Sequence, residues 1–261
     1  PLQAIADLIG VPQEDRHKIF DWSNQMLASD DPDIQGEPDV AAAEILAYAM
    51  MMAADRKANP RDDIVTKLVN AHMGDRGLTD DEFGFFVILL AVAGNETTTS
   101  TFAEGMHLLA SHLEELKKVQ DDPSLVPNMV EEMLRLSTPT AQMWRIAKED
   151  CEVGGVAIPK GATMMVKFHS ANRDETVFPD PDAFKVDRPN LKSQIAFGQG
   201  VHHCLGAPLA RQELMVGFKV ILERMTNFGL PKGQEELEFL PSLLLHPPAK
   251  LSITFDKRQP A

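Results

Sequence analysis

The chain of 261 residues is 44% hydrophobic, which is enough to bury a large core without disulfide bonds. Its 25 basic and 39 acidic side chains give a formal charge of -14, which argues against nucleic acid or an anionic membrane as its partner. With only Cys151 and Cys204, one bridge at most could form. The longest apolar run, residues 85–93, is too short to span a bilayer. No export signal precedes it and cysteine is scarce, so we expect a cytoplasmic protein.

Helical patterns dominate the first half of the chain. Residues 1–29 are amphipathic, and the Ala/Met-rich residues 40–59 predict a helix that Pro60 ends. The Pro/Gly/Asp-rich residues 30–39 between them predict a loop inside one domain. Residues 61–72 again carry apolar side chains at the helical period, which predicts a further helix.

The longest predicted helix begins at Thr79, which forms a capping-box pattern with Glu82. It continues to about Ser111, and because its centre is apolar on all sides we expect it to cross the middle of the protein. Another helix is predicted from about Pro127 to about Leu136, since proline suits the first turn of a helix.

Strand-like patterns follow in the second half. Residues 151–171 contain β-branched side chains, paired glycines and a Pro-Lys-Gly turn, which predict short strands. The tail, residues 243–255, predicts another small hairpin or strand pair. We therefore predict a mainly α fold with minor antiparallel β-sheets, in a single domain over residues 1–261.

The run FGQGVHHCLGAPLAR, residues 197–211, places Cys204 at the entrance of a helix. Gly198 and Gly200 permit a tight loop whose backbone amides approach an atom closely, and Pro208 suits the first helical turn. The helix dipole and the free N–H groups lower the pKa of a thiol placed there. Such a thiolate is a metal ligand or a nucleophile, whereas a small buried hydrophobic residue is the plainer interpretation of a lone cysteine.

This run resembles the haem-binding loop of the cytochrome P-450 monooxygenases, whose pattern is Phe-x-x-Gly-x-His/Arg-x-Cys-x-Gly. The resemblance implies haem b, with Cys204 as axial thiolate ligand, Phe197 shielding the sulfur and His202 contacting a propionate. Thiolate ligation increases the electron density on iron and favours O–O cleavage. The predicted cofactor-binding residues of the loop are Phe197, Gly198, Gly200, His202, Cys204 and Gly206.

The sequence Ala-Gly-Asn-Glu-Thr at residues 93–97 resembles the family's oxygen-activation signature. Ala93 and Gly94 leave space for a flat cofactor and O2 against the helix, and a hydroxyl can bond to a carbonyl one turn back. The resemblance implies that Thr97 and Glu96 are catalytic, since they handle bound oxygen and deliver protons. Ordinary packing is the plainer interpretation of a Thr-rich helix.

Glu132 and Arg135 are three residues apart and share one helix face, and the same spacing argument pairs Glu131 with Arg135. Read alone, these are surface ion pairs of small energy. The first pair fits the family's Glu-x-x-Arg, and the resemblance implies a buried structural network of Glu132, Arg135 and Arg188. It also implies that Arg145 binds the second propionate, with an ordinary solvated arginine as the alternative.

The resemblance covers the whole chain and implies a monomeric enzyme that inserts one oxygen atom of O2 into a C–H bond of a lipophilic substrate. Electrons are expected from a partner, because no flavin- or nucleotide-binding glycine motif is present in this sequence, and the resemblance implies that the partner is a ferredoxin with its reductase. Complete members carry further helices before the position of Pro1, so we expect an N-terminally truncated cytochrome P-450 fold. Three stretches, FDWSNQM, NPRDDIVTKLVNA and LTDDEFGFFVILLAVAGNETT, are most similar to the actinobacterial sterol side-chain hydroxylases. The predicted substrate-lining residues are Phe86, Val87, Leu90, Ala91, Met143, Trp144 and residues 243–245, all of which could equally be core.

Two other functions are open at this point. A di-iron helical bundle would use two Glu-x-x-His motifs, Glu14 with His17 and Glu104 with His107, although the first lies in a polar run typical of surface. A non-catalytic remnant would retain the motifs without binding haem alone.

Overall fold

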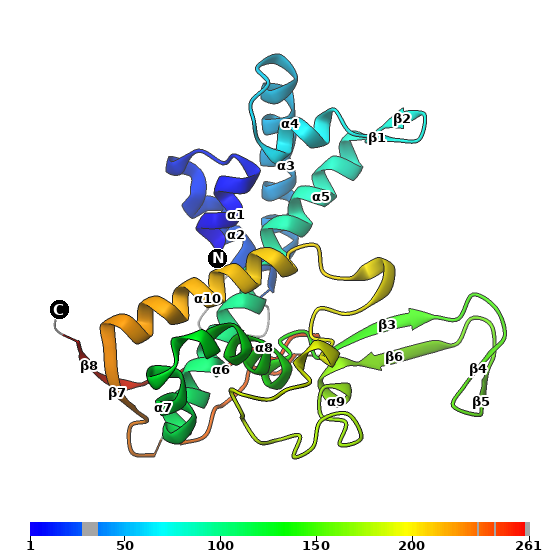
Figure 1. The fold of residues 1–261 in the computed structure, drawn as a ribbon. Helices are drawn as coiled ribbons and strands as arrows, with labels where there is room; N and C mark the ends of the chain where they lie inside the picture. The colour runs from blue at the N-terminus through cyan, green and yellow to red at the C-terminus, as the bar shows by residue number, and fades with distance from the viewer. Residues whose placement is uncertain (28–35, 234, 243, 259–261) are drawn as a thin grey trace. The chain divides into compact units, whose positions relative to one another are not determined.

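The computed structural model describes residues 1–27, 36–233, 235–242 and 244–258, and the chain forms two compact units, residues 1–96 and 97–261. The fold is mainly helical with small antiparallel sheets, which confirms the predicted fold class (Figure 1). The prediction of a single domain stays a prediction. Of the predicted loop at residues 30–39, residues 30–35 lie outside the described residues, as does the predicted substrate contact at residue 243, and the loop prediction is wrong for Pro38 and Asp39, which form the first turn of α3.

The first unit is built from short and medium helices. Buried apolar side chains from four of them, Ile9, Ile19, Ile45 and Val87, form its core, and α3 packs against α2 and α5. Its elements are α1 (Leu2–Ile9), η1 (Gln13–Asp15), α2 (Arg16–Leu27), α3 (Pro38–Ala58), α4 (Ile64–Val69), β1 (His72–Met73), β2 (Arg76–Gly77) and α5 (Asp80–Ala93).

A buried arginine connects three helices of this unit. Arg56 of α3 donates from Nε to Asp63 Oδ2 at 2.5 Å and from Nη2 to the carbonyl of Gly10 at 2.9 Å. Asp63 in turn caps α4 by accepting the N–H of Thr66 at 2.8 Å. The guanidinium therefore bonds to the carbonyl of Gly10 at the end of α1 and to the carboxylate that caps the start of α4.

The predicted capping box at the start of α5 is confirmed. The hydroxyl of Thr79 accepts the N–H of Glu82 at 3.2 Å, and Glu82 accepts the N–H of Thr79 at 2.9 Å. Arg76 binds the same carboxylate with two hydrogen bonds, and this pairing, helped by the Thr79 N–H, lowers the pKa of Glu82 to about 2.

Changing Thr79 to Ala is expected to lower the free energy of unfolding by about 1 kcal/mol, because one N–H of the first turn loses its acceptor. Urea unfolding of the variant measures the effect, and Thr79→Ser is the matched control that keeps the hydroxyl. An Ala variant as stable as the Ser variant would show that the cap contributes nothing.

The second unit carries the remaining helices and the remaining described sheets. Its strands pair antiparallel as β3 with β6, β4 with β5 and β7 with β8, and β4 and β5 form the tip beyond β3 and β6 (Figure 1). Its elements are α6 (Glu96–Ser111), α7 (Leu113–Asp121), η2 (Pro123–Leu125), α8 (Val126–Ser137), β3 (Gln142–Ile146), β4 (Cys151–Val153), β5 (Val156–Ile158), β6 (Thr163–Lys167), α9 (Phe168–Ala171), η3 (Leu191–Ser193), η4 (Gly200–His202), α10 (Ala207–Arg224), β7 (Met225–Gly229) and β8 (Thr254–Lys257).

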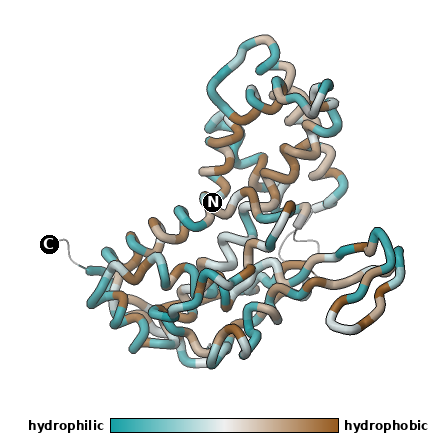
Figure 2. Tube along the Cα trace, turned by 45° about the vertical axis from the view of Figure 1, so that its right-hand side comes forward, coloured by the Kyte–Doolittle hydropathy of each residue, from teal (hydrophilic) through white to brown (hydrophobic). Residues whose placement is uncertain are grey.

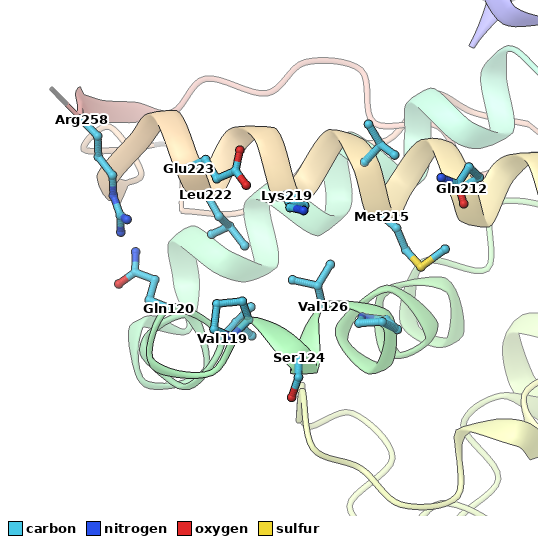
Figure 3. A pocket seen from close by; sticks show the side chains of 13 residues that line it. Val119, Gln120, Ser124, Val126, Gln212, Met215, Lys219, Leu222, Glu223 and Arg258 are labelled. Atoms are coloured by element: carbon cyan, nitrogen blue, oxygen red, sulfur yellow. The ribbon is translucent and has the colours of Figure 1, made fainter. Parts of the chain in front are cut away.

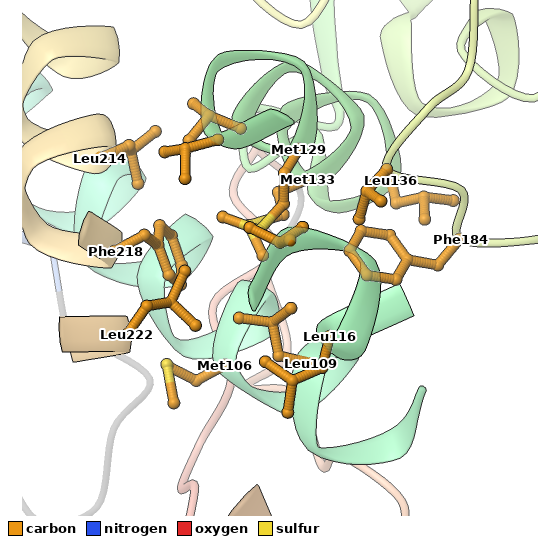
Figure 4. Close-up of a cluster of buried hydrophobic side chains, with 14 of the residues drawn as sticks. Met106, Leu109, Leu116, Met129, Met133, Leu136, Phe184, Leu214, Phe218 and Leu222 are labelled. Carbon is orange, nitrogen blue, oxygen red and sulfur yellow. The ribbon is translucent and has the colours of Figure 1, made fainter. Parts of the chain in front are cut away.

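The hydrophobic core of this unit lies between α6, α8 and α10 (Figure 4). Apolar residues alternate with polar ones along the helices, so each helix turns one face inward (Figure 2). Burial of these side chains is the main stabilising contribution, at about 25 cal/mol per Å² of apolar surface. The labelled members are Met106, Leu109, Leu116, Met129, Met133, Leu136, Phe184, Leu214, Phe218 and Leu222.

The helix predicted from Thr79 to Ser111 is two helices, which corrects the sequence prediction. α5 ends at Ala93 and α6 begins at Glu96, with Gly94 and Asn95 in a turn between them. The side-chain amide of Asn95 donates to Asn24 at 3.3 Å instead of facing solvent, and glycine favours a break. By length and composition alone the stretch Asp80–Ser111 could cross a membrane, since an 18-residue window in it has a mean hydropathy of 1.2, and 39% of that window is buried.

The strand predictions for residues 151–171 were correct at β4, β5 and β6 but wrong at Phe168–Ala171, which form the helix α9, and they were incomplete elsewhere. β3 was missed because its sequence, QMWRI, has only one β-branched residue, and because β6, the strand that it pairs with, is not adjacent to it in the sequence. In the tail, the predicted strand exists as β8 but pairs with β7 after α10. The tail also bridges Thr140 to Leu245 and Phe239 to Pro248.

Candidate functional site

The loop before α10 presents the thiol of Cys204. The backbone N–H of Cys204 donates to the carbonyl of Phe197 at 2.9 Å, and the N–H of Ala207 donates to the carbonyl of Cys204 at 3.3 Å. These bonds close the loop and place Cys204 two residues before Gly206, the N-cap of α10. The thiol is free and exposed, so the plainer interpretation of Cys204 as a buried hydrophobic residue is wrong.

Two glycines give this loop its shape. Gly198 has φ +70° and Gly200 has φ +74°, a left-handed conformation that other residues adopt only with strain. Gly206 is different, since it is right-handed and a Cβ there would lie 3.8 Å from the sulfur of Cys204, in ordinary contact. The predicted glycine requirement therefore rests on conformation at Gly198 and Gly200.

The surroundings of Cys204 fit a large flat apolar group with a soft metal. Val201 is 97% exposed and Leu205 is 76% exposed, so apolar side chains flank the thiol instead of being buried. Soft thiolates suit iron in haem, and large exposed apolar surfaces are typical of binding sites. The donor chemistry and the surface therefore match the haem that the sequence predicts.

The other residues predicted to touch the cofactor have varied surroundings. His202 ends η4 and is exposed, and its neighbour His203 is held by a bond from its ring Nδ1 to the carbonyl of Gly198 at 3.2 Å. Arg145 lies on β3 opposite Met164 and donates from Nη1 to the carbonyl of Trp144 at 2.8 Å.

The predicted oxygen-activation residues span the boundary between the units. Ala93, Gly94 and Glu96 belong to the first unit and Thr97 to the second. The hydroxyl of Thr101 donates to the carbonyl of Thr97 at 3.0 Å, so back-bonding of the kind expected in this helix occurs one turn further on.

The exposed face of α5 differs from the predicted substrate face. Phe85 and Leu89 are exposed and lead to the exposed Ala93, each four residues after the last, whereas Val87 and Ala91 are buried in the core of the first unit. The prediction used the same four-residue spacing, pairing Phe86 with Leu90 and Val87 with Ala91, but the exposed row begins one residue earlier, at Phe85.

The structure brings Glu132, Arg135 and Arg188 together in the interior. Arg135 binds Glu132 through Nε and Nη2 at 2.7 and 2.9 Å, and Arg188 Nε binds both carboxylate oxygens at 3.0 and 3.1 Å. Glu132 and Arg135 are 0% exposed and Arg188 is 4% exposed. The interpretation of this spacing as a surface ion pair is therefore wrong.

Backbone carbonyls satisfy the remaining guanidinium groups. Arg135 donates to the carbonyls of Asn172 and Pro181, at 2.8 and 2.7 Å. Arg188 donates to those of Pro179 and Ala183, both at 2.7 Å. The network thus fixes the irregular segment 172–188 onto α8.

A family model described as cytochrome P450 matches residues 2–255, almost the whole chain. The chain belongs to the cytochrome P-450 family. The steroid C26-monooxygenase of Rhodococcus jostii is 46% identical over 229 residues, covering 88% of this chain and 48% of the relative. The 6-deoxyerythronolide B hydroxylase of Saccharopolyspora erythraea is 35% identical, covering 96% of this chain and 63% of the relative. The chain thus spans about half the length of the steroid monooxygenase that it resembles.

Solved cytochrome P-450 structures match as well. A cytochrome P-450 of Chondromyces apiculatus has a TM-score of 0.89 and 35% identity, covering 99% of this chain and 64% of its own. A cytochrome P-450 of Bacillus megaterium, solved in complex with testosterone, has a TM-score of 0.87 and 34% identity, covering 97% of this chain and 69% of its own.

The di-iron alternative gains no support from the surroundings of its predicted ligands. Glu14 and His17 are exposed in the first unit, Glu104 is buried in the second, and His107 bonds through Nε2 to the carbonyl of Glu235 at 2.9 Å. Within the described ranges no group of at least three His, Cys, Asp or Glu side chains is placed to hold a metal. A cytochrome P-450 takes only one iron ligand from the protein, as predicted for Cys204.

A cavity of about 660 Å³ lies between α7, α8 and α10 of the cytochrome P-450 chain (Figure 3). None of the predicted cofactor or substrate residues lines it. Its lining residues are Val119, Gln120, Pro123, Ser124, Val126, Pro127, Gln212, Met215, Val216, Lys219, Leu222, Glu223 and Arg258.

A group of titratable side chains, of which Glu104 is buried and the others are half-buried, was also missed from sequence. Arg173 donates from Nη1 to His169 Nε2 at 2.9 Å, and the rings of His169 and His246 have centroids 5.5 Å apart. Burial, with the neighbouring Arg173 and His246, lowers the pKa of His169 to about 4. Glu104 is buried with Arg173 as its compensating charge, and burial raises the pKa of this carboxyl to about 8.

The raised pKa of Glu104 predicts that the cytochrome P-450 loses stability as pH rises from 6.5 to 8. The folded state holds the proton of Glu104 up to about pH 8, whereas an unfolded glutamate loses it near its ordinary value, so folding is favoured most at low pH. The lowered pKa of His169 acts in the opposite direction, but only below about pH 6.5. Glu104→Gln should therefore remove the loss between pH 6.5 and 8, as measured by urea midpoints, and an unchanged slope would contradict this.

Proposed function

We propose that the whole protein is a haem-thiolate monooxygenase in which the thiolate of Cys204 would hold the iron of haem b. The observation that carries the proposal is the exposed thiol of Cys204, fixed by its N–H bond to the Phe197 carbonyl in a loop that matches the family pattern. When bound, haem supplies the activation of O2 and the insertion of one oxygen atom into a C–H bond.

The residues of this chain would bind the haem, orient it and supply protons. Phe197 would shield the sulfur of Cys204, and the side chains of the exposed His202 and the half-buried Arg145 would hold the propionates. Ala93 and Gly94 would leave space for the flat cofactor because neither has a bulky side chain, although a Cβ at Gly94 would also clash with Cδ1 of Ile5.

Thr97 and Glu96 handle oxygen and protons in the proposed mechanism. The hydroxyl of Thr97 holds a proton near the bound oxygen, and the carboxylate of Glu96 supplies protons from solvent. Thr97→Ala should therefore keep substrate binding while more electrons end in hydrogen peroxide and fewer in product. The ratio of product formed to electrons consumed measures this, and an unchanged ratio would remove Thr97 from the mechanism.

We infer a lipophilic substrate, and specifically the side chain of a steroid. The support is the 46% identity with a steroid C26-monooxygenase, together with the exposed apolar Met143 and Trp144 beside Arg145 on β3. Leu245, predicted to line the substrate site, is bridged to Thr140, and the carbonyl of Leu244 accepts the N–H of Ala141 at 3.0 Å, so both leucines lie beside the start of β3. A ferredoxin and its reductase supply the electrons, and the protein acts as a monomer in the cytoplasm.

The experiment that tests this function supplies the haem-loaded whole protein with a ferredoxin system, 18O2 and a steroid that carries an alkyl side chain. The expected result is a steroid product that is one 18O atom heavier, with the hydroxyl on the side chain. Labelled product from a fatty acid but not from the steroid would correct the substrate class, and no labelled product from any lipid would contradict the proposed activity.

The alternative of a non-catalytic remnant is tested on residues 1–261 alone. Haem added to this chain should bind and give the thiolate spectrum if these residues suffice for the cofactor. A chain that stays folded without binding haem, beside a whole protein that binds it, would assign the missing contacts to the rest of the protein.

A further inference from the structure

Glu131 and Arg211 form an ion pair that contacts the ring of Phe197 in the loop of residues 197–206, which carries Cys204 and is called the cysteine loop. Arg211 of α10 donates from Nε and Nη2 to the two carboxylate oxygens of Glu131 on α8, at 2.6 and 3.1 Å. The sequence pairs Glu131 with Arg135 by helical spacing, and this is wrong because Arg135 binds Glu132 instead. Arg211 is 80 residues from Glu131, so no local pattern predicts the contact.

The guanidinium of Arg211 lies over Phe197. Its Cζ atom is 4.5 Å from the ring centroid, a distance at which a cation is attracted by the negative face of the ring. The two hydrogen bonds to Glu131 fix the plane of the guanidinium, because a bidentate pair has a defined geometry. Arg211 therefore cannot turn away from Phe197 without losing a bond to Glu131.

Glu131 is itself held on its other side. Gln194 donates from Nε2 to Glu131 Oε2 at 3.0 Å and accepts the N–H of Ala196 at 2.6 Å. Gln194 is 7% exposed, so this amide is part of the packed interior. The segment that leads into Phe197 is thus tied to the same carboxylate that orients Arg211.

We propose that Glu131 and Arg211 are positioning residues that hold the Phe197 ring beside Cys204 and set the reduction potential of the haem iron. The inference rests on the proposed function, since it takes Cys204 as the iron ligand. Phe197 is linked to Cys204 by the bond between the Cys204 N–H and the Phe197 carbonyl at 2.9 Å. The environment and hydrogen bonding of a ligating sulfur control the potential of its metal.

The small energy expected of this ion pair indicates that it sets the reduction potential of the iron and contributes little to the stability of the fold. The side chains of Arg211 and Glu131 are 34% and 26% exposed, and an ion pair that solvent reaches contributes little to folding. A charge fixed near the iron still changes the balance between its ferric and ferrous states. Removing Arg211 favours the more positive ferric state, whereas removing Glu131 leaves the charge of Arg211 uncompensated and disfavours it.

The test is potentiometric titration of the haem-loaded protein and its variants. Arg211→Met should shift the potential of the haem iron to more negative values, and Glu131→Gln should shift it to more positive values. Arg224→Met is the matched control, because it removes the same charge from the exposed far end of α10. Equal potentials for wild type, Arg211→Met and Glu131→Gln would overturn the proposal, as would shifts no larger than that of Arg224→Met.

A second variant separates an effect through the ring from an effect of charge alone. Phe197→Leu removes the ring, so Arg211→Met should shift the potential less in that background than in wild type. An equal shift in both backgrounds would overturn the role of Phe197. If Arg211→Met fails to fold, Arg211→Lys takes its place, because lysine keeps the charge and loses the planar guanidinium. A reduction potential equal to that of wild type in Arg211→Lys would overturn the positioning role of Arg211. Failure of the proposed function is distinguishable, because the wild-type spectrum would then lack thiolate ligation altogether.

Discussion

Changing Glu132 to Gln is expected to destabilise the protein by about 3–5 kcal/mol, the range measured when a buried ion pair loses one partner. Glu132 is the carboxylate that compensates the guanidinium groups of Arg135 and Arg188, which hardly contact solvent. Without it, two positive charges stay buried with only backbone carbonyls as partners. Because domains are stable by only about 5–15 kcal/mol, we expect little folded protein.

Urea unfolding of the haem-free protein measures this effect, with Glu131→Gln as the matched control. Both residues lie on α8 and the substitution is identical, but the ion pair of Glu131 is partly exposed and is expected to cost less than about 1 kcal/mol. If the two variants unfold at the same urea concentration, the buried network does not carry the stability assigned to it.

The sequence predicts the parts of this fold that depend on local chemistry. The capping box at Thr79 and the proline in the first turn of α10 both depend on neighbours within a few residues, and both are present. The break between α5 and α6 was missed, because Asn95 is held by Asn24, a residue 71 positions away. Strand β3 was missed for a similar reason, since β6 stabilises it.

In the candidate site, too, the features that depend on local sequence could be predicted, and most of the contacts between distant residues could not. The left-handed glycines of the cysteine loop could be predicted, since the loop sequence itself requires them. The pairing of Glu132 with Arg188, 56 residues apart, was expected only from the family resemblance. The contact of Glu131 with Arg211 and the cluster around Arg173 were not expected, because they join side chains that only the folded chain brings together.

Changing Cys204 to Ser is expected to abolish product formation and to weaken haem binding. A serine hydroxyl is a poor ligand for haem iron and does not donate electron density as a thiolate does. The loop itself should persist, because its bonds are between backbone groups and the shape depends on Gly198 and Gly200. Haem content after gel filtration and product formed per haem measure the two effects.

Cys151→Ser is the matched control for this change. Cys151 is also a free, exposed cysteine, but it lies on β4 away from the cysteine loop in sequence. It should bind haem and form product as wild type does. If both serine variants behave alike, whether active or inactive, the assignment of Cys204 as the specific ligand is wrong.

The most direct test of the central claim is the absorption spectrum of the haem-loaded protein, reduced under carbon monoxide. Ligation by the Cys204 thiolate predicts the red-shifted Soret band of thiolate-bound haem, and Cys204→His should replace it with the unshifted band of a nitrogen-ligated haem. A wild-type spectrum without the red-shifted band, or one that Cys204→His leaves unchanged, would contradict the account.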